Sequence, residues 1–303
     1  MTTSPLTVPR INRILLPIDF TPESKAAFTR AVEVARIYHA SLLLVHVIAH
    51  PTATGMANVL PGALVELQSD LQCDLDKLHE LATAQGVPCT TLLREGSVLE
   101  HVRDITHRSA IDLLVLATHG GHGLQGFFLG STAERIIRAT TVPVLTIGIA
   151  KHQPSWDEFG ARHILFAGDF CPETLCGLEY ALRIQLRTNA KLSIVRVVSP
   201  GAKLEAVRAI REHIAPLVPP GTDIYTPEGS IGPTVCRVAR ELGVGLVTLG
   251  VHKSSFAREV FGTGLLEILL NAPCPVLSVR QCNDAAPSIQ IEAHGYAWPT
   301  AQP

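Results

Sequence analysis

The most informative stretch of the sequence is a glycine-containing loop that follows an apolar run and precedes a segment with helical spacing. Residues 117–120 read Ala-Thr-His-Gly, and nine residues later residues 130–134 read Gly-Ser-Thr-Ala-Glu. Ser131 and Glu134 fit the capping-box signature of a helix start. Gly120 and Gly130 can adopt backbone angles that side chains disfavour, and they let a ligand approach the main chain. N–H groups at a helix start favour an anion, so the pattern predicts a phosphate site, with an ordinary glycine loop as the alternative.

A second candidate group is the carboxylate of Asp19, at the end of the first apolar run, 11–18. Thr21, Pro22 and Glu23 follow it and form a typical helix start. An ionised carboxylate only accepts hydrogen bonds, so it suits ribose hydroxyls and would repel phosphate. Capping of the next helix is the competing role, and from the residues alone the two roles are equally supported.

The composition indicates a globular protein with a well-buried core, because 47% of the 303 residues are apolar and 17% are charged. A formal net charge of −2 gives no electrostatic reason to expect a nucleic acid or an acidic membrane surface as partner. The seven cysteines form no Cys-x-x-Cys pair, which favours reduced thiols and a cytoplasmic location. The uncharged segment 41–65 is interrupted by His46, Pro51 and Pro61, so it is not expected to span a membrane.

Buried-strand and helical patterns alternate along the first half. The expected strands are 11–18, 41–47, 89–94, 111–116 and 144–147. This alternation predicts an α/β fold, a doubly wound open parallel sheet with helices on both faces. A strand order of 3-2-1-4-5 would place the first and fourth strands side by side, where ligands bind such sheets.

The same pattern then restarts, which indicates a tandem duplication. Asp-Phe-Cys-Pro-Glu at 169–173 repeats Asp-Phe-Thr-Pro-Glu at 19–23, and Glu-Gly-Ser at 228–230 repeats 95–97. We therefore expect two tandem five-stranded domains, at 10–149 and 161–280. Residues 150–160 form the expected linker and 281–303 a C-terminal tail.

The loop of the second repeat departs from that of the first. Gly250 stands where Ala117 stands, Lys253 replaces Gly120, and Leu266 replaces Glu134. A lysine at a close-approach glycine puts a long side chain where the main chain should meet phosphate, although its charge could contact phosphate instead. We expect weak or absent nucleotide binding in this repeat.

These residues resemble the universal stress protein family, over about residues 10–149 and 161–280. ATP-binding members of the family carry Gly-x2-Gly-x9-Gly-(Ser/Thr) after the fourth strand, and this sequence matches that spacing with alanine at the first glycine. The resemblance implies ATP contacts from Pro17, Ile18, Asp19, Val47, Leu116, Ala117, Gly120, Gly130, Ser131 and Thr132. In the second repeat the matching positions are Asp169, Gly250, Gly262 and Thr263.

The resemblance implies an ATP-binding stress-response sensor or regulatory binding module, with nucleotide in the first domain and Mg²⁺ as a candidate companion. It also implies that the fifth strands, 144–147 and 276–279, pair within the chain. Whether two such chains form a further homodimer is left open. No P-loop, nucleophile elbow or general base is evident. We therefore expect that the protein is not an enzyme and that any ATP hydrolysis is slow and incidental. His119 and His122 alone are weak evidence for a metal site.

Two other functions remain open at this stage. One is a non-nucleotide scaffold that binds a protein or a small apolar ligand, as Lys253 and the 56–64 segment suggest. The other is an enzyme of the wider adenine-nucleotide hydrolase-like group. The sequence does not identify the protein partner.

Overall fold

The computed structural model describes residues 11–48, 61–118, 129–148, 156, 161–171, 174–251 and 263–280, and side chains at all of these except 61–64, 213 and 263. Two compact units divide the chain. One is Arg10–Val142, and the other is Pro143–Pro303 together with Met1–Pro9. The expected linker, apart from Trp156, and the expected tail lie outside the described residues.

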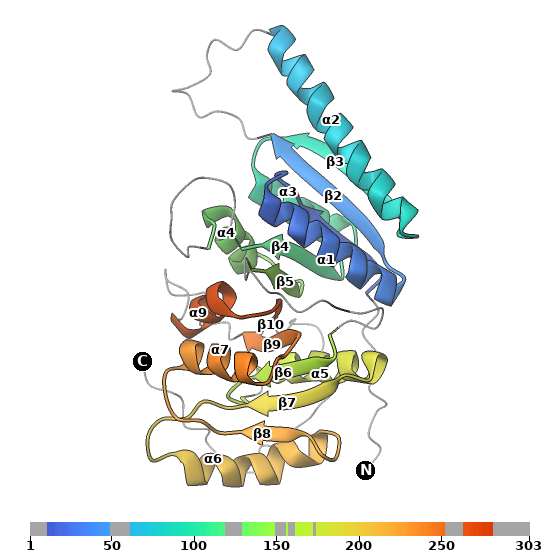
Figure 1. Ribbon diagram of the computed structural model, residues 1–303. Helices are drawn as coiled ribbons and strands as arrows, with labels where there is room; N and C mark the ends of the chain where they lie inside the picture. The colour runs from blue at the N-terminus through green and yellow to red at the C-terminus, as the bar shows by residue number, and fades with distance from the viewer. Residues whose placement is uncertain are drawn as a thin grey trace. The chain divides into compact units, whose positions relative to one another are not determined.

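The Arg10–Val142 unit alternates strands and helices (Figure 1). Its elements are β1 Arg13–Pro17, α1 Pro22–Tyr38, β2 Ser41–Ile48, α2 Pro61–Ala84, β3 Cys89–Glu95, α3 Val98–Arg108, β4 Leu113–Ala117 and α4 Ser131–Ala139.

The start of α1 follows from local sequence chemistry. Thr21 is the N-cap, and its side chain accepts a hydrogen bond from the main-chain N–H of Ser24. Pro22 occupies the first helical position, where its fixed φ suits a helix and no N–H is needed. The predicted helix start is therefore confirmed.

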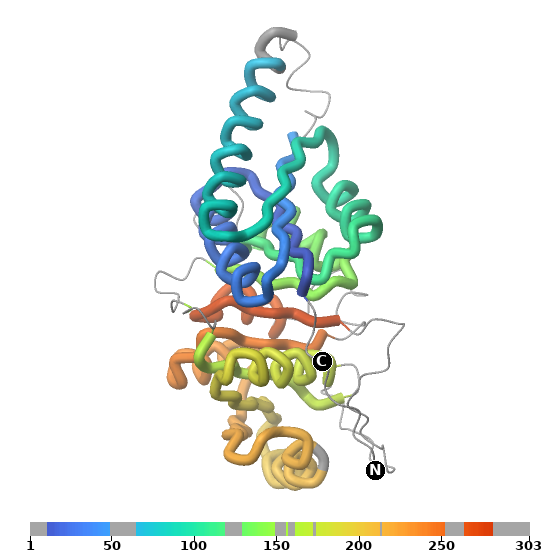
Figure 2. The backbone as a smooth tube through the Cα atoms, turned by 90° about the vertical axis from the view of Figure 1, so that its right-hand side faces the viewer, coloured from blue at the N-terminus to red at the C-terminus, as the bar shows by residue number. Residues whose placement is uncertain are grey.

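The strands of this unit lie in the order β3-β2-β1-β4 and run parallel. Ile14, Leu15 and Leu16 of β1 are fully buried, as expected for a strand covered on both faces. Figure 2 shows α1 and α2 on one side of these strands and α3 on the other. The winding thus reverses between β1 and β4, where an open sheet of this kind binds its ligands.

The second unit contains the remaining elements. They are β5 Val144–Ile147, β6 His163–Ala167, α5 Leu175–Thr188, β7 Lys191–Val195, α6 Lys203–Ala209, β8 Asp223–Tyr225, α7 Ile231–Glu241, β9 Leu246–Val251, α9 Thr263–Asn271 and β10 Val276–Arg280. A π-helical turn, Ile210–Ile214, and a 3-10 turn, Ala215–Leu217, continue α6.

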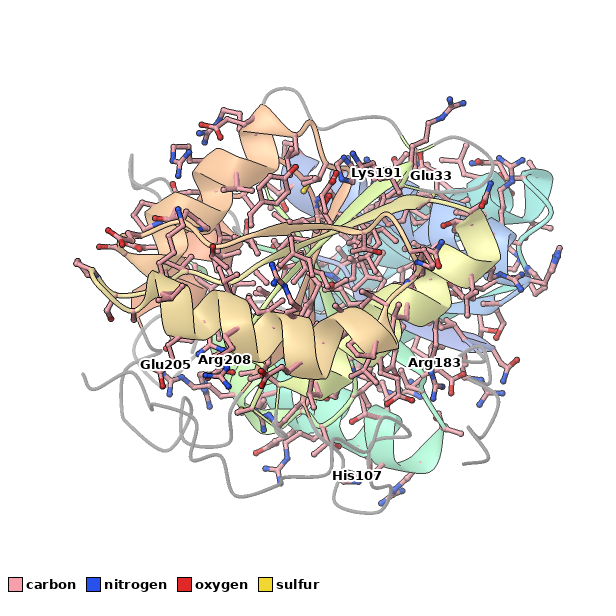
Figure 3. The ribbon with its side chains drawn as sticks, turned by 90° about the horizontal axis from the view of Figure 1, so that it is seen from below. Glu33, His107, Arg183, Lys191, Glu205 and Arg208 are labelled. Atoms are coloured by element: carbon pink, nitrogen blue, oxygen red, sulfur yellow. The ribbon has the colours of Figure 1, made fainter. Side chains whose placement is uncertain are left out.

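Helix α6 is amphipathic over its short length. Ala206 and Ala209 are buried, whereas Glu205 and Arg208 are exposed and lie side by side on its outer face (Figure 3). Arg208 also forms an ion pair with Glu212, at 3.0 Å between Nε and Oε1. Such exposed pairs contribute little to stability, so the small buried residues hold α6 in place.

The described strands of the second unit lie in the order β5-β10-β9-β6-β7-β8. Strands β8, β7, β6, β9 and β10 are parallel and reproduce the order 3-2-1-4-5 within the second repeat. The first four strands of the first repeat follow the same order, so the predicted doubly wound α/β fold is confirmed.

Strand β5 belongs to the first repeat in sequence but packs in the second unit. It pairs antiparallel with β10, with Leu145 opposite Leu277 and Val144 opposite Ser278. The implied pairing of the two fifth strands is confirmed. The compact units therefore divide at Pro143, while the repeat boundaries at 149 and 161 stay a prediction.

Helix α5 packs against β9 through two glycines. A Cβ on Gly250 would overlap the main chain of Thr174, and a Cβ on Gly177 would overlap the main chain of Leu249 and Gly250. Glycine is therefore required at both positions for the close approach of the helix to the strand.

We expect Gly250→Ala to lower the free energy of unfolding by about 1–3 kcal/mol, the usual cost of overpacking. The matched control is Gly148→Ala, because an added Cβ there meets nothing within 4 Å. Urea unfolding followed by circular dichroism measures both. Equal stability of the two variants would contradict the close packing of α5 on β9.

Candidate functional site

The carboxyl ends of three neighbouring strands form the centre of the candidate site. Pro17 on β1 is opposite Val45 on β2, and Leu15 is opposite Leu114 on β4. Carried two residues further, the β1–β4 register sets Pro17 beside Leu116, and Ala117 follows at the end of β4. The residues after all three strands therefore meet at one edge of the sheet.

The main chain after β1 is fixed to β2. Ile18 donates its N–H to the carbonyl of Val45 at 2.9 Å, and its own carbonyl accepts from Nδ1 of His46 at 2.7 Å. This bond requires the His46 tautomer that carries its proton on Nδ1. The His46 ring also contacts Phe20, with centroids 4.9 Å apart.

Asp19 is exposed and forms a tight turn with Thr21. Its Oδ1 accepts from the Thr21 main-chain N–H at 3.1 Å and from the Thr21 hydroxyl at 2.5 Å. Partial burial raises the pKa of Asp19, but hydrogen bonds from Thr21 and Ser24 outweigh it, so the pKa lies below its usual value of 3.8. The carboxylate thus supports the helix cap, which is compatible with contact to a ligand through its exposed side.

Helix α4 begins beside the end of β4. The N–H of Gly130 donates to the carbonyl of Thr118 at 2.9 Å, which joins the two ends of the intervening loop. Gly130 is the N-cap, and the first helical bond runs from Glu134 N to the Gly130 carbonyl. The predicted strand–loop–helix order is confirmed for the parts of this stretch that the structure describes.

The predicted Ser131–Glu134 capping box is wrong. Ser131 is the first helical residue and not the N-cap, and no side-chain hydrogen bond caps the helix. Glu134 instead forms an ion pair with Arg138, at 2.8 Å between Oε1 and Nη2. The i,i+4 arginine competes for the carboxylate, and this leaves the exposed hydroxyls of Ser131 and Thr132 at the helix start.

The expected reason for glycine at position 130, a special backbone angle, is also wrong. Its φ of −55° and ψ of 134° are accessible to any residue, so no special backbone angle demands glycine there. Its N–H is already bonded to Thr118. Helix geometry leaves the next N–H groups, those of Ser131, Thr132 and Ala133, without intrahelical acceptors.

The structure brings nine of the ten predicted contact residues to this region. Pro17 ends β1 and is followed by Ile18 and Asp19, Leu116 and Ala117 end β4, and Val47 lies near the end of β2. Gly130, Ser131 and Thr132 join them through the Thr118 hydrogen bond. Gly120, His119 and His122 lie outside the described residues. Contact between these residues and a ligand stays a prediction.

The second repeat keeps the aspartate turn but packs the start of its next helix directly against β9. Oδ1 of Asp169 accepts from the Thr174 hydroxyl at 2.8 Å and from the Cys171 N–H at 3.2 Å. The main chain of Thr174 then packs directly over Gly250. The expectation of weak or absent nucleotide binding in this repeat stays a prediction. Lys253 and Gly262 lie outside the described residues, as does the side chain of Thr263.

Three residues of the first-repeat site were not predicted as site residues. Phe20 adopts a left-handed conformation with φ of 62°, and its counterpart Phe170 does so with φ of 64°. His46 and Thr21 fix the main chain and the carboxylate on either side of Phe20. The repeated Asp-Phe pair, at 19–20 and 169–170, was the available sequence signal for this shared turn.

The ranges that the structure describes contain no group of three or more His, Cys, Asp or Glu side chains arranged to hold a metal ion. None of the helices in these ranges combines the length and the apolar character that a membrane span needs.

The hydrogen bonds to Asp19 predict a specific pH response. We expect Thr21→Ala to raise the Asp19 pKa and to cost about 1 kcal/mol through loss of the helix cap. Thr21→Ser keeps the hydroxyl and should leave the pKa low. Because folding lowers this pKa, the stability it contributes is present above pH 3.8 and is lost as pH falls through the folded value. NMR titration of the Asp19 carboxyl tests this, and identical pKa values in all three proteins would contradict it.

Comparison with known proteins agrees with this architecture. The model of the universal stress protein family matches residues 10–148. Universal stress protein A homolog 1 of Coxiella burnetii is 37% identical over 137 residues, which cover 44% of this chain and 94% of that protein. Universal stress protein A of Salmonella typhi is 32% identical over 142 residues, covering 44% of this chain and 92% of the relative.

A crystal structure of a universal stress protein from Archaeoglobus fulgidus shares the fold of both repeats. It covers 91% of this chain and 98% of its own, with a TM-score of 0.70 and 18% sequence identity. The sequence match over the first repeat and the fold match over both repeats lead to one conclusion: the chain belongs to the universal stress protein family.

Proposed function

We propose that the first repeat binds ATP and that the protein works as a stress-response sensor or regulatory binding module. The observation that carries the proposal is the hydrogen bond from Gly130 to Thr118. It sets the start of α4 against the end of β4, on the edge of the sheet that also carries Asp19. Hydrogen-bond donors for phosphate and a hydrogen-bond acceptor for ribose hydroxyls are thus available at the same edge of the sheet, where its winding reverses.

The phosphates would lie at the start of α4. The N–H groups of Ser131, Thr132 and Ala133 lack intrahelical acceptors, and the positive end of the helix dipole favours an anion. The exposed hydroxyls of Ser131 and Thr132 add two further donors. Glu134 is the acidic residue of this first turn, and its pairing with Arg138 reduces its repulsion of phosphate.

The nucleoside would lie along the ends of β1 and β2. Asp19 is exposed and acceptor-only when ionised, which suits the ribose hydroxyls. Ile18 and Val47 are apolar and almost fully buried, at 4% and 9% exposure, so they would provide the floor of the adenine side. The His46 bond to the Ile18 carbonyl keeps this floor in place before the ligand arrives.

This donor set supports binding more than catalysis. We assign no described residue of the site as a general base: Oδ1 of Asp19 already accepts two hydrogen bonds from Thr21, and we assign the rest of this carboxylate to the ribose. We therefore expect ATP turnover to be slow and incidental. A Mg²⁺ ion bound with ATP would take most of its ligands from phosphate and water. The cysteine pattern makes the cytoplasm the expected location.

The decisive variant is Ser131→Asp. An acidic residue in the first turn of a helix stabilises the helix, so the fold should survive. The new carboxylate would repel phosphate, and we expect ATP affinity to fall by about tenfold or more, or about 1.4 kcal/mol. Ser131→Asn is the neutral control of similar size and should bind ATP more tightly than Ser131→Asp.

Isothermal titration with ATP measures these affinities, and acid extraction of the purified protein tests for nucleotide retained from the cell. Absence of saturable ATP binding by the unmodified protein would refute the proposal. Equal affinities for the aspartate and asparagine variants would refute the assignment of phosphate to α4. Rapid ATP hydrolysis that is lost in Asp19→Ala would show an enzyme instead.

A further inference from the structure

The second repeat contains a pocket at the carboxyl ends of its own strands. The pocket has a volume of about 170 Å³ and lies among the ends of β6 and β9 and the segment that follows β7. Residues of α7 and α9, including Val235 and Ile268, close its far side. It therefore occupies, in the second repeat, the same part of the fold that we assign to nucleotide in the first.

The walls of this pocket are more apolar than the matching surface of the first repeat. Val251 stands at the position of Thr118, and Leu265 stands at the position of Ala133. The first change replaces a hydroxyl by a methyl group, and the second adds apolar volume beside the start of α9. Together with Val197 they form a surface with few polar groups to satisfy a nucleotide.

The size of the pocket also disfavours a nucleotide. A cavity of about 150 Å³ accommodates benzene, whereas sites for larger ligands usually measure about 300–1,000 Å³. The Thr174 main chain packed over Gly250 prevents enlargement on the side of β9. Asp169, whose carboxylate is held by Thr174 and Cys171, also lines the pocket; because the first repeat has the matching Asp19, the two sites differ in the apolar walls and not in this charge.

The pocket has a route of entry at its rim. The Ile231 side chain, at the start of α7, is 51% exposed although it also lines the pocket. Val197 and Leu265 are partly exposed as well. An apolar molecule could therefore enter past these exposed side chains without opening the sheet.

We propose that the second repeat binds a small, uncharged, apolar molecule of about the size of a monocyclic aromatic ring. The two repeats then have separate ligand classes, an adenine nucleotide in the first and an apolar compound in the second. Burial of apolar ligand surface against the valine and leucine walls supplies the driving force. The proposal rests on the second-repeat pocket alone and does not require nucleotide in the first repeat.

Fluorobenzene titrated into the full chain without nucleotide tests the proposal by ¹⁹F NMR. We expect saturable binding to the unmodified protein. Val197→Phe should abolish it, because the added ring fills the pocket from a partly exposed position. Leu186→Phe is the matched control, since that side chain is 56% exposed and does not line the pocket.

A second variant covers the case in which Val197→Phe fails to fold. Val251→Thr restores the hydroxyl of the first repeat at nearly constant volume, and it should weaken fluorobenzene binding about fivefold or more. No saturable binding up to the solubility of the probe would overturn the proposal. Binding unchanged in both pocket variants, or displacement of the probe by ATP, would overturn it as well.

Discussion

A single main-chain hydrogen bond, from Gly130 to the Thr118 carbonyl, organises the first-repeat site. It closes the loop between β4 and α4 and thereby aims the N-terminal end of α4 at the edge where β1 ends. The donors at the start of the helix and the carboxylate of Asp19 therefore belong to the same edge of the sheet. The buried side chains of Ile136 and Ile137 hold the rest of α4 in place.

The two repeats show how one architecture can lead to different pockets. Both retain the aspartate and the left-handed phenylalanine that follows it. Helix α1 begins at Pro22, directly after the Thr21 cap, whereas α5 begins at Leu175 with no side-chain cap bond. The delayed start allows the Thr174 main chain to rest on Gly250, a contact that alanine at the corresponding position, 117, would obstruct.

The fifth strands illustrate a different constraint, the need to cover a sheet edge. Strand β10 would expose unpaired N–H and carbonyl groups on the side away from β9, and such edges invite aggregation. Antiparallel pairing with β5 satisfies them, and the Thr146 hydroxyl adds a hydrogen bond to the Val276 carbonyl at 3.1 Å. A strand of the first repeat is therefore an integral part of the second compact unit.

The sequence by itself determined the order of strands and helices, the duplication and the set of residues at the strand ends, because apolar periodicity and turn residues are local properties. It led to a wrong cap for α4, since Ser131 and Glu134 satisfy a local pattern while Arg138 competes for the carboxylate one turn later. Only the tertiary structure decided that His46 and Phe20 belong to the site, that Thr174 closes over Gly250, and that apolar walls remain beside Asp169. Those outcomes depend on contacts between segments far apart in the chain, which local patterns do not encode.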